Sequence, residues 1–75
     1  MNLNFEGNSK KMYDVVLENI PMLMRGLAKK QIEAWVEKKN LTTLTEDHIY
    51  QALKDIAPQS LADKVVPQLD ALKSK

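Results

Sequence analysis

The sequence predicts an all-α fold, a small bundle of about four helices. Apolar residues recur at helical spacing along most of the chain, and prolines and capping residues divide that pattern into segments. At 75 residues the chain has room for one domain with one core. We therefore expect a single helical domain over residues 9–72, an irregular N-terminal arm at 1–8 and a frayed tail at 73–75.

The first helix is expected from about Lys10 to Asn19. Ser9 is its predicted N-cap. Asn19 disfavours a helix interior and Ile20, which precedes a proline, is pushed towards extended geometry, so the helix should end there. Met12, Val15, Val16 and Asn19 lie at positions i, i+3, i+4 and i+7, the spacing of residues that share one face of a helix.

The second helix is expected from Pro21 to about Lys39. Proline suits a first turn because it has no N–H to donate and its φ is near the helical value. The joint has almost no linker, so the first two helices should meet at a sharp angle at Pro21. We expect a core-facing stripe made of Met24, Leu27, Ala28, Gln31, Ile32, Trp35 and Val36.

The last two helices follow an extended connector at 41–44. Thr45 is the predicted N-cap of a third helix, which should pack on the second and end before Pro58. Ser60 to Asp63 resembles a capping box at the start of a fourth helix. Pro67 lies inside that helical pattern, so the fourth helix should be kinked or broken near it.

The composition excludes several kinds of chemistry. The chain has no cysteine, one histidine and two isolated glycines, so disulfides, thiolate catalysis, His-rich metal sites and phosphate loops are not expected. His48 is expected to have a surface or capping role. We predict no catalytic residue, no cofactor and no metal.

The partner classes are narrowed by hydropathy and charge. No apolar run approaches the roughly 20 residues of a membrane span, and the first residues lack the features of a signal peptide. We expect a soluble cytoplasmic protein without a membrane role. The net charge of +1 argues against nucleic acid as a partner.

Basic residues near the joint are candidates for partner binding. Arg25 and Lys29 repel each other at i, i+4 near the positive end of the second helix, which is unfavourable locally. Two interpretations compete. Glu18 and Glu33 neutralise these cations, or the cations form a patch with Lys30 that meets a carboxylate or phosphate of a partner. Charge reversal at Arg25 is expected to weaken partner capture without unfolding the domain.

The methionines beside the joint complete the candidate surface. Met22 and Met24 either fill gaps in the core or provide an adaptable contact surface. The candidate partner-binding residues are Pro21, Met22, Met24, Arg25, Lys29 and Lys30.

One pattern runs through residues 17–54, about half of the chain. It consists of Ile20-Pro21, Arg25, Lys29, Glu33, Thr45, Tyr50 and Lys54, with Ala52-Leu53 before the last of these. This pattern resembles the small C-terminal domain of the B subunit of light-independent protochlorophyllide reductase, in which a small pair usually stands at the place of Ala52-Leu53. Two further departures are Met22-Leu23-Met24, in place of a more aromatic and β-branched run, and Asn40, where the family tends to have glycine.

The resemblance implies a function beside a larger enzyme. In that family an iron–sulfur-dependent complex reduces a tetrapyrrole ring, and the small domain is an appendage near the active site. These 75 residues contain no counterpart of the catalytic body and no cysteine for a cluster. The resemblance therefore implies a non-catalytic interaction or accessory module, with a tetrapyrrole or nitrogenase-like reductase component as its protein partner. A direct tetrapyrrole contact through Met22, Met24, Trp35 and Arg25 is a weaker implication.

A second resemblance points to a different class. Residues 44–54, after a short helix, a long helix and an extended loop, resemble the third-helix region of histone-fold proteins. That resemblance implies a helical homodimer. The second helix is short for a histone-fold central helix, and the near-zero net charge weakens a role on DNA. This alternative therefore predicts dimerisation with weak or no DNA binding.

Overall fold

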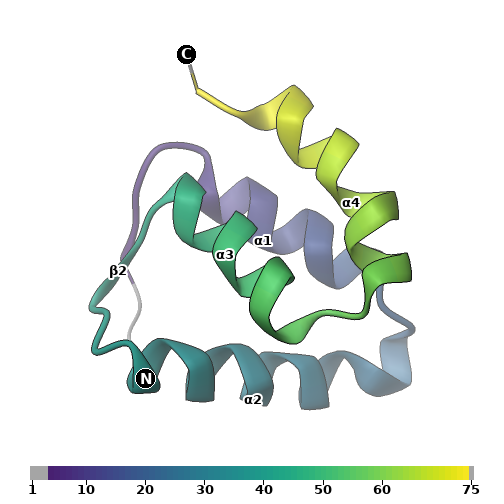
Figure 1. The fold of residues 1–75 in the computed structure, drawn as a ribbon, viewed down its shortest axis with the longest axis horizontal. Coiled ribbons are helices and arrows are strands. Elements are labelled where there is room, and N and C mark those ends of the chain that lie inside the picture. The colour runs from purple at the N-terminus through teal and green to yellow at the C-terminus, as the bar shows by residue number, and fades with distance from the viewer. Residues whose placement is uncertain (1–3, 75) are drawn as a thin grey trace.

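The computed structural model describes residues 4–74 and confirms the all-α prediction (Figure 1). Residues 1–3 of the expected arm and residue 75 of the expected tail lie outside the described part. Within it, α1 and α3 form the centre, and each packs on both α2 and α4. The helices are α1 (Ser9–Glu18), α2 (Met22–Lys38), α3 (Glu46–Ile56) and α4 (Gln59–Leu72).

A short parallel pairing joins the N-terminal arm to the connector between α2 and α3. Strand β1 (Asn4–Phe5) pairs with β2 (Thr43–Leu44), with Phe5 opposite Leu44. The Phe5 ring also packs on Tyr13, with 5.5 Å between ring centroids. The irregular arm was therefore a wrong prediction for residues 4–5. Two residues are too few to show the alternation of a strand, and the partner lies far along the chain.

The start of α1 also differs from the prediction. Asn8 occupies the N-cap position, and Ser9 lies inside the first turn, where it is fully buried. The Ser9 hydroxyl donates a hydrogen bond to the Leu44 carbonyl at 2.9 Å. A serine that caps a helix must keep its hydroxyl near the helix N–H groups, but here a tertiary bond to β2 uses it.

Glu46, at the start of α3, holds the two ends of the described chain together. Its carboxylate accepts bonds from the Asn8 N–H at 2.8 Å and from the N–H and hydroxyl of Ser74. The Asn8 N–H bond first, and then the Ser74 bonds, hold the pKa of the Glu46 carboxyl below its ordinary value. Ser74 is therefore anchored, although the tail was expected to fray.

The caps of the later helices agree in part with the prediction. Thr45 is the N-cap of α3, and its N–H donates to Nδ1 of His48 at 3.1 Å, so the expected capping role of His48 is confirmed. The capping box expected at Ser60 is wrong, because the extended backbone of Pro58 starts α4 at Gln59. Helix α4 continues through Pro67, so it is not broken there, and the kink remains a prediction.

The core lies between the helices and the connector. Trp35 is buried as expected, and its indole N–H donates to Asp55 at 2.9 Å at the edge of the core. Leu44, in the connector between α2 and α3, is also buried. The fully buried apolar residues are Met12, Val36, Leu44, Val65 and Leu69.

Candidate functional site

The joint between α1 and α2 is as short as predicted, but Pro21 has a different place in it. Helix α1 ends at Glu18 and α2 begins at Met22, so Pro21 is the N-cap and not the first helical residue. Its φ of −52° and ψ of 139° are extended. An extended residue here turns the chain sharply, and the Pro21 carbonyl then accepts a bond from the Met24 N–H at 2.8 Å.

Arg25 braces this joint. Its Nε–H is shared between the carbonyls of Leu17, at 2.9 Å, and Ile20, at 3.0 Å. A guanidinium nitrogen lies 3.4 Å from the Glu18 carbonyl. The cation therefore meets the backbone at the end of α1, and not the Glu18 carboxylate as one interpretation expected. The last carbonyls of a helix lack partners within the helix, and this end of its dipole is negative. A role in folding thus explains the position of Arg25.

The first half of the stripe predicted for α2 is exposed. Burial falls along the helix from Val36, which is fully buried, to Leu27 and Met24, which are 56% and 54% exposed. Met22 and Leu23 are 76% and 99% exposed. The prediction that Met24 and Leu27 face the core is therefore wrong. We call Met22, Leu23, Met24 and Leu27 the apolar end of α2.

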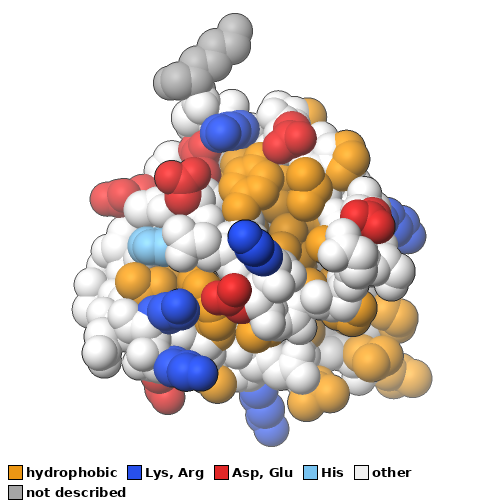
Figure 2. Space-filling model, viewed as in Figure 1, with side chains coloured by type: hydrophobic (Ala, Val, Ile, Leu, Met, Phe, Trp, Pro, Cys, Tyr) orange, Lys and Arg blue, Asp and Glu red, His pale blue; other side chains and the backbone are white. Residues whose placement is uncertain are grey.

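The space-filling view shows how this surface lies on the molecule. Hydrophobic side chains gather at the lower right edge of Figure 2, over the N-terminal end of α2 as it is placed in Figure 1. Gly26 lies among these residues, and a Cβ atom there would meet nothing within 4 Å. The close approach of another segment that Gly26 permits is thus not made within residues 4–74.

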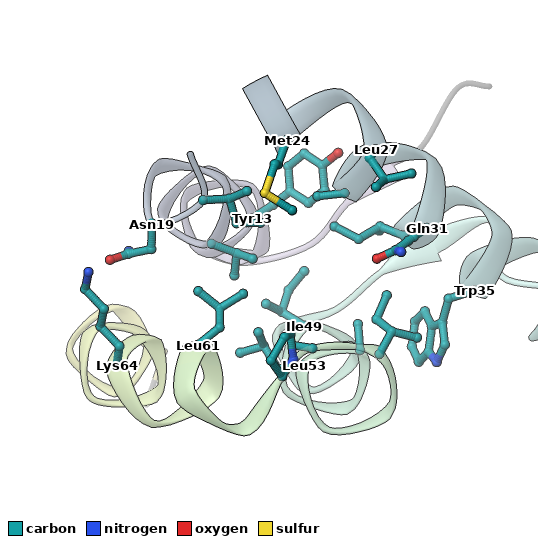
Figure 3. A pocket seen from close by; sticks show the side chains of 18 of the residues that line it. Tyr13, Asn19, Met24, Leu27, Gln31, Trp35, Ile49, Leu53, Leu61 and Lys64 are labelled. Atoms are coloured by element: carbon teal, nitrogen blue, oxygen red, sulfur yellow. The ribbon is translucent and has the colours of Figure 1, made fainter. Parts of the chain in front are cut away.

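A groove lies beside the apolar end of α2 (Figure 3). Its volume is about 570 Å³. In Figure 3, Met24, Leu27 and Gln31 of α2 face Leu61 of α4 and the α3 residues Ile49 and Leu53 across this space. The groove is lined mainly by apolar side chains, which include Val16, Ile20, Met24, Leu27, Ala28, Ile32, Ile49, Leu53, Ile56 and Leu61.

Charge is distributed unevenly around the groove. Among its lining residues in the described chain, Lys64 is the one cation and no Asp or Glu is present. Lys29 and Lys30 are exposed and form no ion pair within residues 4–74, so the Lys29–Glu33 pair expected as one interpretation is not formed. The groove is thus apolar, with one basic residue, Lys64, among those that line it.

Two polar side chains that line the groove are already hydrogen-bonded within the fold. His48 lines the groove, but its Nδ1 accepts the capping bond, and the indole N–H of Trp35 is bonded to Asp55. Across the part of the chain that the structure describes, no three His, Asp or Glu side chains are grouped as metal ligands. No described helix has both the length and the apolar character needed to cross a membrane.

The sequence-based candidates are only partly brought together. Pro21, Met22 and Met24 lie at the joint and are exposed, whereas Arg25 is directed to the end of α1. The residues predicted from the sequence do not include the exposed Leu23 and Leu27. They also do not include Ile56, Leu61 and Lys64 on the other side of the groove. One signal was present: Leu23 lies off the 3–4 stripe, so one packed face could not bury all the apolar residues of this helix.

Comparison of the chain with family models, curated proteins and solved structures found no match. Both family resemblances therefore remain predictions that rest on the residues quoted for them.

Proposed function

We propose that this chain is a non-catalytic interaction module that binds a protein partner through the apolar end of α2 and the adjacent groove. One observation carries the proposal: four large apolar side chains within six residues are each more than half exposed. Contiguous exposed apolar surface of this kind is typical of protein interaction sites. Methionines in such a surface adapt to the shape of a partner.

The resemblance to the reductase domain supplies a candidate class of partner. We propose a component of a tetrapyrrole or nitrogenase-like reductase, bound by an accessory module that itself holds no cluster. Pro21 belongs to the Ile20-Pro21 element that carries this resemblance, and it is exposed beside the apolar end of α2, which supports the assignment. The cysteine-free composition fits a reducing compartment, and we propose the cytoplasm as the site of the interaction.

Capture from the native host tests the proposal. The tagged wild-type chain is compared with a Leu23→Ser/Leu27→Ser variant and with Ala71→Ser, an exposed position of α4. We expect a partner that is retained by wild type and Ala71→Ser and lost from the double variant. Equal capture by all three chains would remove the apolar end of α2 from consideration.

The exposed residues of α2 also favour the alternative, a histone-like helical homodimer. In that case Leu23 and Leu27 would be covered by a second copy. Light scattering separates the two proposals, because a strict monomer at high concentration contradicts the dimer. A salt titration tests the DNA role, and the absence of salt-sensitive affinity would remove it.

A further inference from the structure

We infer that the groove receives an amphipathic helix of the partner that carries acidic residues on both sides of its apolar face. This inference rests on the proposed function, and it specifies the chemistry of the segment that is bound. Shape, apolar contacts and charge support it separately.

The length of the groove matches three turns of helix. On the α2 side its lining runs from Met24 to Trp35, which is about 16 Å at a rise of about 1.5 Å per residue. Helices that bind in grooves use anchors at i, i+3 or i+4, and i+7, which span about 10 Å. The groove is therefore long enough for one such set of anchors. Its volume of about 570 Å³ is also in the range of ordinary binding sites.

Half-exposed apolar side chains lie on both sides of the groove. Met24 and Leu27 belong to α2, and Ile56, which is 36% exposed, belongs to the end of α3. A helix laid between them would cover all three. Met22 and Leu23 extend the apolar surface beyond the groove, so the bound helix would keep apolar contacts as it leaves.

The charges around the groove select an acidic helix. Lys30 is not among the lining residues, but it lies one turn after Leu27, which lines the groove from α2. Lys64 lines the opposite side, on α4, and lies towards Asn19 in Figure 3. Neither lysine forms an ion pair within residues 4–74. Carboxylates on the two flanks of a bound helix would meet these cations at the solvent-exposed rim, where charge mainly sets specificity and association rate.

The same charges disfavour a second copy as the occupant. The apolar end of α2 lies in a segment that also contains Arg25, Lys29 and Lys30, and this segment has no acidic residue between Ile20 and Gln31. Seating that segment in the groove of another copy would bring it towards Lys64. Juxtaposed like charges suppress association, so an acidic partner is favoured.

Two designed peptides test the inference. Both have the same length and the same leucines at i, i+4 and i+7, and one carries glutamates on the flanks where the other carries lysines. Fluorescence anisotropy of the labelled peptides with the full chain should give at least tenfold tighter binding of the glutamate peptide. Leu27→Ser should weaken that binding tenfold or more. Lys30→Glu/Lys64→Glu should reverse the preference between the peptides. The control Lys11→Glu/Lys54→Glu, at two exposed lysines that do not line the groove, should preserve it.

Several results would overturn the inference. Equal affinity for the two peptides, or an unchanged preference in Lys30→Glu/Lys64→Glu, would exclude the role of charge. A homodimer that buries Leu27, or saturation by palmitate while neither peptide binds, would assign the groove to another occupant. Circular dichroism of each variant excludes unfolding as the cause of lost binding. If neither peptide binds but capture in the host still depends on Leu23 and Leu27, the inference fails and the proposed function stands.

Discussion

Replacing Arg25 with alanine should destabilise the joint between α1 and α2. The side chain serves the carbonyls of Leu17, Glu18 and Ile20 at the end of α1. Leu17 keeps a second partner in the variant, because its carbonyl also accepts the Ile20 N–H at 3.0 Å. The carbonyls of Glu18 and Ile20 would depend on water.

The size of the effect follows from these bonds. A hydrogen bond to a charged group contributes about 1.5–3 kcal/mol, and a cation at a helix C-terminus contributes about 0.3–1 kcal/mol. Arg25 is only partly buried, so water would replace part of what is lost. We expect the free energy of unfolding to fall by about 1–2 kcal/mol, or Tm by roughly 4–16 °C at 4–8 °C per kcal/mol. Arg25→Lys should lie between alanine and wild type, because an ammonium cannot reproduce the planar fork.

Urea denaturation followed by far-UV circular dichroism measures this change. Lys29→Ala is the matched control, since it removes a cation one turn later that forms no ion pair in the described chain, and it should stay within about 0.5 kcal/mol of wild type. Equal stability of Arg25→Ala and Lys29→Ala would refute the bracing role. The structure also revises one expectation from the sequence: Arg25→Glu would place a carboxylate against backbone carbonyls, so it should unfold the joint as well as alter partner capture.

Three further predictions concern the core and the two ends of the pH range. Leu69→Ala, at a fully buried position, should cost about 2–5 kcal/mol in urea denaturation, whereas Leu23→Ala, at an exposed one, should cost less than about 0.5 kcal/mol. The pKa of Glu46 is lower in the folded chain than its ordinary value of 4.5, so the hydrogen bonds to its carboxylate stabilise the fold above pH 4.5. This stabilisation is lost as the pH falls through the lower, folded pKa. Glu46→Gln should therefore flatten the pH dependence of Tm below about pH 4.5. Burial first, and then the hydrogen bond to Asp70, raise the pKa of Tyr50 to about 12. The neutral hydroxyl therefore stabilises the fold below pH 10, and this stabilisation is lost between pH 10 and 12. Asp70→Asn should lower the pKa of Tyr50, as measured by spectrophotometric titration.

Helix boundaries could be predicted from the sequence because they depend on neighbouring residues. Thr45 caps α3, and Asn40 has a left-handed φ of 57° after the end of α2, a conformation that asparagine tolerates better than most residues. Pro21 marked the joint to within one residue. Each of these residues acts on backbone groups no more than a turn away, so its effect is readable without knowledge of the fold.

The candidate site could be predicted only in part. The joint and its two methionines were located, because a proline between two helical patterns is a local signal. The exposure of Leu27 was not predicted, and neither was the position of Leu61 and Lys64 opposite it. Leu61 and Lys64 belong to α4, some 35 residues further along the chain, and their position depends on how the helices pack.

By itself, the sequence predicted about four helices, a sharp turn at Pro21 and an apolar surface along the second helix. The tertiary structure decided which part of that surface is buried. It placed Trp35 and Val36 in the core and left Leu23 and Leu27 exposed beside a groove. It also directed Arg25 to the carbonyl groups at the end of α1. Helical periodicity gives the direction in which a side chain points around the helix axis. Only the angle between packed helices decides which residues that side chain contacts.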